Sequence, residues 1–200
     1  DWSSDVCSSD LDEESDIYFQ SQDWNNLIKK YNASSLSIKC PIWGYQGLNK
    51  YYTTAALQSR GRWLMVWNDD ATMLTKGWDD YVKSNIDFIG MIHMPTINFK
   101  PNLTLFPLIP AVWLQLFGEI SSHQLNDSWI QDICYEADAV RAIPVEVFHD
   151  RYDATGNNLD ATFQNRNYGK KVYYHETMKV IRSKWAQHLK QYREIGRAHV

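Results

Sequence analysis

Two adjacent aspartates, Asp69 and Asp70, follow an apolar segment near the middle of the sequence. That segment, residues 62–67, reads RWLMVW and predicts a buried strand. Ligands of open α/β sheets bind beyond the carboxyl ends of strands, so the two carboxylates lie where a ligand is expected. Neighbouring carboxylates repel each other unless a positive charge lies between them. The pair therefore indicates a site for Mg²⁺ or Mn²⁺, shared with substrate phosphates. The alternative is a turn with one capping and one solvated carboxylate.

Two segments around this pair resemble one family, the nucleotide-sugar glycosyltransferases of GT-A fold. The stretch GRWLMVWNDDATMLTKGWDD (61–80) resembles the family's buried strand and its acidic D-x-D motif, with Asn68 in place of the first acid. The stretch LNKYYTTAALQSRG (48–61) resembles the helix that follows the nucleotide loop, with Asn49 at the family's asparagine. The resemblance implies that Asp70 is a metal ligand. It also implies that Asn49, Asn68 and Asp69 contribute to donor binding.

A third segment, FGEISSHQLNDSWIQDICYEADAVRAIPVEVFHD (117–150), resembles the family's acceptor side. Asn126-Asp127 occupies its Glu-Asp position, and His149 occupies its terminal histidine. The resemblance implies that His149 binds the metal or the diphosphate through a neutral imidazole. It implies that Asp127 is the general base for the acceptor hydroxyl. Asp132 is the competing base, but it lies on a different face of the same predicted helix.

The function that this resemblance implies is metal-assisted sugar transfer with inversion at the anomeric carbon. The donor is a nucleotide sugar, the cofactor is Mn²⁺ or Mg²⁺, and the acceptor is a glycan, a lipid or a protein. The acidic stretch DEESD, which begins at Asp12, corresponds to the family's contact with the base or ribose. Two other functions stay open. One is a non-catalytic sugar- or nucleotide-binding module, and the other is a metal-dependent nucleotidyltransferase, which the short loop 44–47 disfavours.

Alternating strands and helices must position these residues. The periodicity predicts a helix over 48–60, which ends at Gly61. A second helix is predicted to begin at Pro110 and to end at Gly118. The predicted strands are 35–39, 62–67, 86–93 and 141–150; the other predicted helices are 22–32, 77–85, 126–139 and 170–192. This order predicts an α/β fold, GT-A-like (Rossmann-like), with a mixed, mostly parallel sheet flanked by helices and its N-terminal strand or strands truncated.

Composition excludes several classes of function. The net charge of −4 gives no electrostatic footprint for nucleic acid or an anionic membrane. Cys40 and Cys134 are isolated, which indicates buried, reduced thiols and a cytoplasmic protein. No run of eighteen apolar residues occurs, so no membrane span is expected. Most of the nine Trp and twelve Tyr are expected to fill the core.

The two ends of the chain resemble a translated sequencing adapter. DVCSSDL near the start and EIGRAHV at the end can be encoded by complementary strands of one DNA element. We therefore expect residues 1–11 and 194–200 to be artefacts of assembly. Residues 12–193 are expected to form one partial glycosyltransferase domain, long enough for a sizeable core.

Overall fold

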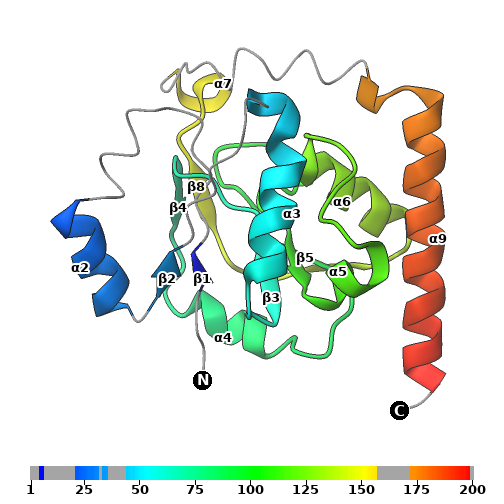
Figure 1. The fold of residues 1–200 in the computed structure, drawn as a ribbon, viewed down its shortest axis with the longest axis horizontal. Coiled ribbons are helices and arrows are strands. Elements are labelled where there is room, and N and C mark those ends of the chain that lie inside the picture. Colours follow the sequence, from blue (N-terminus) through cyan, green and yellow to red (C-terminus); the bar gives the residue numbers. More distant parts are fainter. Residues whose placement is uncertain (1–4, 7–20, 32, 36–43, 157–171, 199–200) are drawn as a thin grey trace.

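The computed structural model describes residues 5–6, 21–31, 33–35, 44–156 and 172–198 (Figure 1). The helices are α2 (Gln22–Lys30), α3 (Leu48–Gln58), α4 (Trp78–Lys83), α5 (Val112–Phe117), α6 (Asn126–Glu136), α7 (Tyr152–Thr155) and α9 (Glu176–Ala198), with a 3-10 turn η1 (Gly44–Gly47). The strands are β1 (Asp5–Val6), β2 (Ser34–Ser35), β3 (Trp63–Met65), β4 (Ala71–Met73), β5 (Met91–His93), β6 (Leu108–Pro110), β7 (Val140–Ala142) and β8 (Val147–His149). The expected α/β class is confirmed.

The central sheet has four strands in the order β3-β6-β5-β7. Strand β6 runs antiparallel to both of its neighbours, whereas β5 and β7 are parallel. The expected sheet containing 62–67 and 86–92 is present, but the prediction that it is mostly parallel is wrong. The connections explain the difference. Residues 94–107 join β5 to β6 without a helix, which suits antiparallel neighbours, whereas α5 and α6 form the crossover that parallel β5 and β7 require.

Two small sheets lie outside the central one. Strands β4 and β8 pair antiparallel, and β1 pairs with β2 in parallel. The predicted strand 141–150 is divided into β7 and β8 by a tight turn at Pro144, in which the Val145 N–H donates to Ile143 O at 2.8 Å. Proline lacks a backbone donor and interrupts the ladder at this point. Strand β4 was not predicted, and it places the segment after the acidic turn directly beside β8.

The predicted strand 86–93 begins only at Met91, because residues 84–87 form a turn after α4, in which the Phe88 N–H donates to Asn85 O at 2.9 Å. Just before Met91 the chain also passes its neighbour very closely. Gly90 has φ 156°, and an ideal Cβ built there would lie 2.3 Å from the Ala139 carbonyl oxygen. The Met91 N–H donates to that same oxygen at 2.8 Å. Only glycine fits such an approach, so this contact fixes where β5 meets the segment that leads into β7.

Helix α6 supplies one wall of the larger core. Its predicted inward-facing residues are all fully buried: Trp129, Ile130, Ile133 and Cys134. This confirms the 3.6-residue periodicity read from the sequence. Burial raises the pKa of the Cys134 thiol to about 12, so the thiol behaves as a small apolar group. Cys40 lies outside the described residues.

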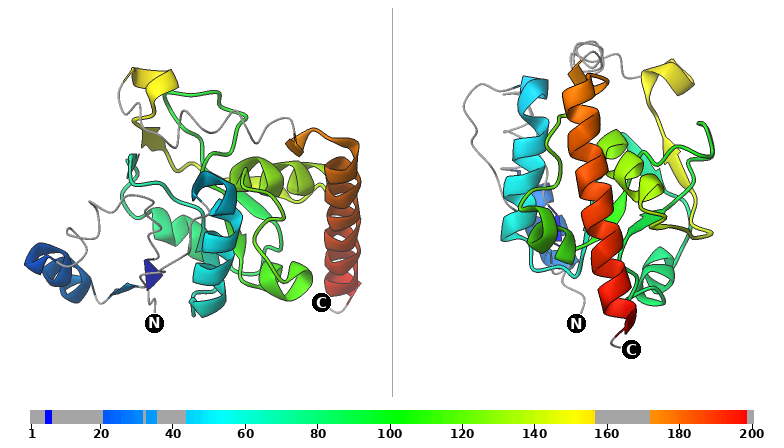
Figure 2. Two further views of the ribbon diagram at one scale, coloured as in Figure 1. Left: turned by 45° about the horizontal axis from the view of Figure 1, so that its top comes forward. Right: turned by 90° about the vertical axis from the view of Figure 1, so that its right-hand side faces the viewer.

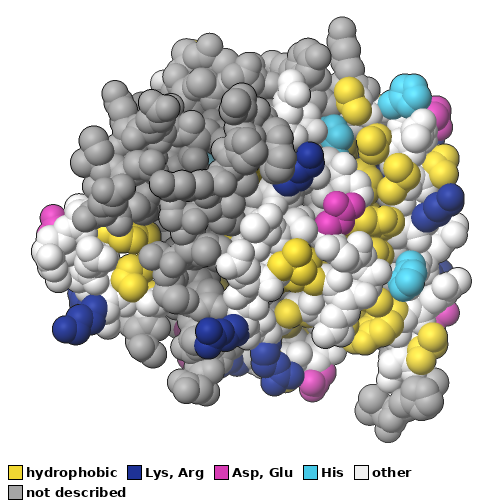
Figure 3. Space-filling view, viewed as in Figure 1, with side chains coloured by type: hydrophobic (Ala, Val, Ile, Leu, Met, Phe, Trp, Pro, Cys, Tyr) yellow, Lys and Arg dark blue, Asp and Glu magenta, His cyan; other side chains and the backbone are white. Residues whose placement is uncertain are grey.

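Helix α9 closes the core from the outside. Figures 1 and 2 show it along one edge of the molecule, beside α5 and α6. Trp185 stacks on Phe117 of α5, with ring centroids 4.3 Å apart, and meets Trp129 of α6 edge-on at 5.4 Å. Hydrophobic side chains gather over this part of the surface (Figure 3). The helix starts later and ends later than predicted, and it continues through Ala198 into the range assigned to the adapter.

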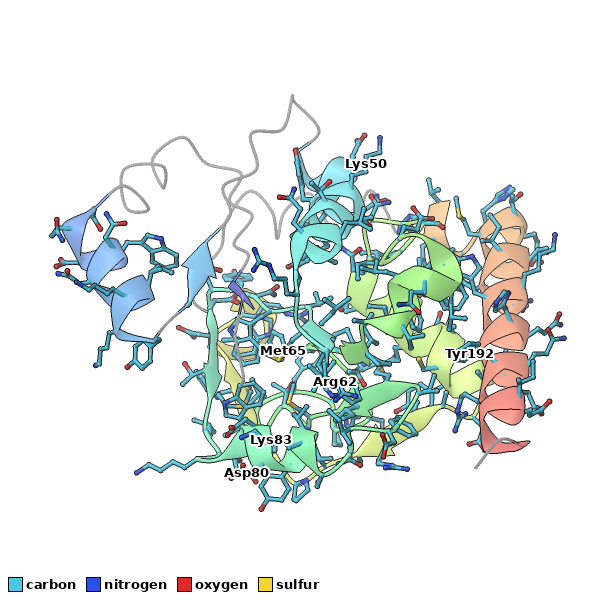
Figure 4. All side chains as sticks on the ribbon, turned by 60° about the horizontal axis from the view of Figure 1, so that its bottom comes forward. Lys50, Arg62, Met65, Asp80, Lys83 and Tyr192 are labelled. Carbon is cyan, nitrogen blue, oxygen red and sulfur yellow. The ribbon has the colours of Figure 1, made fainter. Side chains whose placement is uncertain are left out.

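The periphery is more polar. Helix α2 has no buried residue and stands apart from the main body in Figure 1. Helix α4 carries an exposed charge cluster, in which Lys83 contacts Asp79 at 2.6 Å and Asp80 at 3.1 Å (Figure 4). Gly118 ends α5 with φ 75°, as its predicted position requires. Within the described part of the chain, no helix is both long enough and apolar enough to cross a bilayer.

Candidate functional site

The acidic turn lies between β3 and β4. After β3 the Val66 N–H donates to Pro107 O at 3.1 Å, and this bond keeps the chain next to the residue that precedes β6. It then turns, and the Ala71 N–H donates to Asn68 O at 3.3 Å. Asn68 and Asp69 are exposed, whereas the Asp70 side chain is only 23% exposed. The turn therefore presents two side chains to solvent and directs the third toward the protein.

Asp70 contacts His149, a residue 79 positions later in the sequence. The His149 Nε2 nitrogen lies 2.8 Å from Asp70 Oδ1. The β4–β8 register brings the two residues together, because Ala71 pairs with His149 and the Asp150 N–H donates to Asp70 O at 2.9 Å. The structure thus joins the two side chains that were predicted to share a metal. Their role as metal ligands stays a prediction.

The His149 imidazole is held in a nearly closed aromatic environment. Its side chain is 3% exposed, and the ring meets Phe106 edge-on with centroids 4.9 Å apart. Phe106 in turn packs against Trp67 at 4.8 Å. Because a carboxylate only accepts, His149 donates from Nε2 in this contact. The buried Nδ1 atom has no hydrogen-bond partner among the described residues.

Asn98 binds the backbone of His149 on its other side. The Asn98 Nδ2 group donates to His149 O at 2.7 Å, and the His149 N–H donates to Asn98 Oδ1 at 3.2 Å. Sequence reasoning missed this residue. The two partners are 51 positions apart, and a lone asparagine in a loop carries no periodic signal.

Asp127 lies in the first turn of α6, where the helix N-terminus favours a negative charge. The Ser128 hydroxyl donates to its Oδ1 atom at 3.4 Å. Burial raises the pKa of Asp127, while hydrogen bonding from Ser128 and the positive charge of Arg151 oppose that rise without cancelling it. The carboxylate is therefore partly desolvated, and the donors and positive charge beside it compensate for that only in part.

Tyr52 lies near both the acidic turn and Asp127. Its hydroxyl group donates to Trp67 O at 3.1 Å, directly before that turn. Burial raises the pKa of Tyr52, and the negative charges of Asp127, Asp69 and Asp70 raise it further. All three carboxylates thus lie within electrostatic range of one hydroxyl group. Tyr52 was not singled out from the sequence, because a tyrosine inside a helix is most simply read as a core residue.

Asp132 has different surroundings. The Tyr173 hydroxyl donates to Asp132 Oδ2 at 2.5 Å, and Arg182 Nε lies 3.5 Å from the same oxygen. Arg182 also donates to Tyr173 O at 2.8 Å, and its guanidinium lies 4.1 Å from the centroid of the Tyr173 ring. This carboxylate joins α6 to α9 and the residues before it. The structure therefore gives Asp132 a stabilising role.

Asn49 and Asp12 are the remaining predicted donor-binding residues. The Asn49 side-chain amide donates to Ser121 O at 3.0 Å, and the neighbouring Thr53 hydroxyl accepts from the Ile120 N–H at 3.0 Å. These bonds connect α3 to the loop that leads into α6. Asp12 lies outside the described residues. The donor-binding roles of Asn49 and Asp12, like those of Asn68 and Asp69, stay predictions.

The described residues offer two protein ligands, Asp70 and His149, at the predicted metal site. Among the described residues, no group of three or more His, Cys, Asp or Glu side chains is placed to hold a metal ion. Two ligands are compatible with Mg²⁺ or Mn²⁺, which usually bind one or two carboxylates, water and substrate phosphates. Adjacent ligands of an octahedral Mg²⁺ lie about 3 Å apart, given bonds of about 2.1 Å. The 2.8 Å separation of Asp70 Oδ1 and His149 Nε2 is close to that value, but Nε2 carries the proton in this contact. Binding a metal through Nε2 would therefore require the proton to move to Nδ1.

No protein-family model, no curated protein and no solved structure matches this chain. The structure itself establishes a mixed α/β fold in which Asp70 contacts His149. It also places Asp127 and the acidic turn in electrostatic range of Tyr52. A functional assignment therefore rests on these contacts and on the resemblance of the three sequence motifs.

Proposed function

We propose that this chain belongs to a metal-dependent, inverting glycosyltransferase that uses a nucleotide-sugar donor. The observation that carries the proposal is the contact between Asp70 and His149 at 2.8 Å. These residues come from two different motif segments, and the proposed chemistry requires them to meet. A purely structural origin of the motifs would not require a contact between residues 79 positions apart.

The donor half of the reaction needs positive charge near a leaving diphosphate. A divalent ion bound by Asp70 and His149 would supply that charge as a Lewis acid. In this proposal Asp70 binds through its carboxylate, and the buried packing of His149 against Phe106 orients the imidazole. Asp69 and Asn68 remain exposed beside them, where they can contact the donor.

The acceptor half of the reaction needs a base. In this proposal Asp127 takes the proton of the acceptor hydroxyl, whose oxygen attacks the anomeric carbon from the face opposite the leaving group. A carboxylate with a raised pKa is a stronger base than an ordinary one, and burial raises the pKa of Asp127. Asp132 is not offered this role, because Tyr173 and Arg182 already bind its carboxylate.

The test is nucleotide binding with and without metal. Titration calorimetry of the chain with uridine and guanosine diphosphate sugars should show about tenfold or greater tightening by Mn²⁺, which corresponds to about 1.4 kcal/mol. Asp70→Ala should remove this dependence, and Asp69→Ala should leave part of it. Asp80→Ala, an exposed aspartate on α4, serves as the control and should bind like the wild type. Equal affinity in Mn²⁺ and in excess chelator would overturn the proposal.

A further inference from the structure

Strand β8 is hydrogen bonded on both of its edges. On one edge it pairs with β4. On the other edge the short segment 95–97 forms a parallel bridge, in which Thr96 is paired with Val147. The Val147 N–H donates to Pro95 O at 3.1 Å, and the Ile97 N–H donates to Val147 O at 3.0 Å. His149 follows two residues later, at the next position that faces this segment.

The parallel ladder does not continue through the backbone to His149. In a regular parallel ladder the backbone of residues 97 and 99 would bind the N–H and C=O groups of His149. The chain turns away instead, with the Phe99 N–H directed to Thr96 O at 3.3 Å. The Asn98 side chain takes the missing place: its carboxamide accepts from the His149 N–H and donates to His149 O.

We propose that Asn98 is a positioning residue that holds the Asp70–His149 pair in its binding geometry. A carboxamide is planar and carries one acceptor and one donor group, as a peptide unit does, so it can replace both bonds of the missing rung. Fixing the His149 backbone, together with the ring contact with Phe106, determines where Nε2 lies relative to Asp70. The consequence for donor binding rests on the function proposed above.

The loop that carries Asn98 is itself anchored. His93 Nδ1 lies 2.7 Å from Thr104 Oγ1, and His93 Nε2 lies 2.9 Å from Pro101 O. Pro101 O can only accept, so Nε2 carries the proton and Nδ1 accepts from the threonine hydroxyl. The Arg151 guanidinium packs over Phe99, 4.5 Å from the ring centroid. These contacts hold the loop after Asn98, and the bonds of Pro95 and Ile97 to Val147 hold it before Asn98, so the loop presents the Asn98 amide to His149 from a fixed position.

The experiment compares Asn98→Ala and Asn98→Asp with Asn85→Ala. Asn98→Asp keeps the acceptor for the His149 N–H but presents a second acceptor to the His149 carbonyl. Asn85 is the control, because it too makes side-chain hydrogen bonds, to Tyr81 O at 2.7 Å and from Arg141 at 2.6 Å, but on the surface at α4. The first readout is the ¹⁵N NMR spectrum of the His149 imidazole, assigned with His149→Gln. The second is Mn²⁺ affinity measured by electron paramagnetic resonance.

Both Asn98 variants should shift the His149 Nε2 resonance, because the Nε2–H···Asp70 bond is lengthened or lost. Mn²⁺ affinity should fall by roughly 10–100-fold, as for other groups that orient a metal ligand. Asn85→Ala should leave both readouts at the wild-type values. An unchanged His149 spectrum in folded Asn98→Ala or Asn98→Asp would overturn the inference. If the wild type itself fails to bind Mn²⁺, the proposed function fails, and the imidazole spectrum still decides the role of Asn98.

Discussion

Helix α6 carries two aspartates that differ in their surroundings. Asp132 has the Tyr173 hydroxyl at 2.5 Å and the Arg182 guanidinium at 3.5 Å, although its side chain is 43% exposed. Asp127 is more desolvated, yet its side-chain donor is a Ser128 hydroxyl at 3.4 Å, and burial raises its pKa. A carboxylate with a short hydroxyl donor and a counter-charge beside it contributes to stability. A carboxylate whose burial is only partly compensated destabilises the fold and is available to act on another molecule.

The largest expected effect is on turnover. Asp127→Asn keeps the size and one acceptor of the side chain but cannot take a proton, so kcat for sugar transfer should fall by about 10²–10⁴-fold. The donor Kd should stay near the wild-type value, because Asp127 is not proposed to contact the diphosphate. Asp132→Asn is the matched control on the same helix and should retain turnover. Loss of turnover in Asp132→Asn instead would reverse the assignment of the two residues. If both variants kept full turnover, the non-catalytic binding module would become the better description.

The second expected effect is on stability, and here Asp132 matters more than Asp127. Asp132→Ala removes the acceptor of Tyr173 and the counter-charge of Arg182, whose side chain is nearly buried. The free energy of unfolding should fall by about 1–3 kcal/mol, measured by urea denaturation. Asp80→Ala on α4 should change it by less than about 0.5 kcal/mol, since Lys83 keeps Asp79. Equal losses at the two positions would mean that the Asp132 contacts contribute nothing specific.

The smallest expected effect is the pH dependence of stability that Asp127 causes. The folded-state pKa of Asp127 is raised above its unfolded value, so the folded chain holds the proton more tightly. Stability from this group is therefore full below the unfolded pKa, about 3.9, and is lost as pH rises through the raised folded pKa. Asp127→Asn should thus melt at a higher temperature than the wild type at neutral pH, and this gain should shrink at acid pH. A gain that is constant across the pH range would show that burial does not cause it.

The periodic parts of the fold were predictable from the sequence. Trp129, Ile130 and Ile133 repeat at helical spacing, and all are buried. Gly118 adopts the positive φ that its place after α5 requires. Both features are encoded within one or two turns of chain, so local spacing is sufficient to find them. The contact of Asp70 with His149 was also anticipated, but from motif resemblance and not from local pattern.

The relative direction of the strands in the central sheet could not be predicted from local spacing. Strand β6 lies in an apolar run that contains Pro110, and this proline was interpreted only as the start of a helix. Its pairing with β3 and β5 decides the antiparallel order, and this pairing joins residues far apart in sequence. Asn98 and Tyr52 were missed for the same reason. Each side chain forms hydrogen bonds with the backbone of one residue far along the sequence, and such bonds leave no periodic pattern.

The burial of Cys134 has a kinetic consequence. Its sulfur has no exposed surface, and the thiol pKa of about 12 leaves almost no thiolate at neutral pH. A thiol reagent can therefore modify Cys134 only during openings that separate α6 from the sheet and from α9. When reclosing is fast, the rate of modification measures the free energy of that opening, just as amide exchange does. Peptide-level mass spectrometry of the modification of Cys134 thus measures core opening in the wild-type chain, without any substitution.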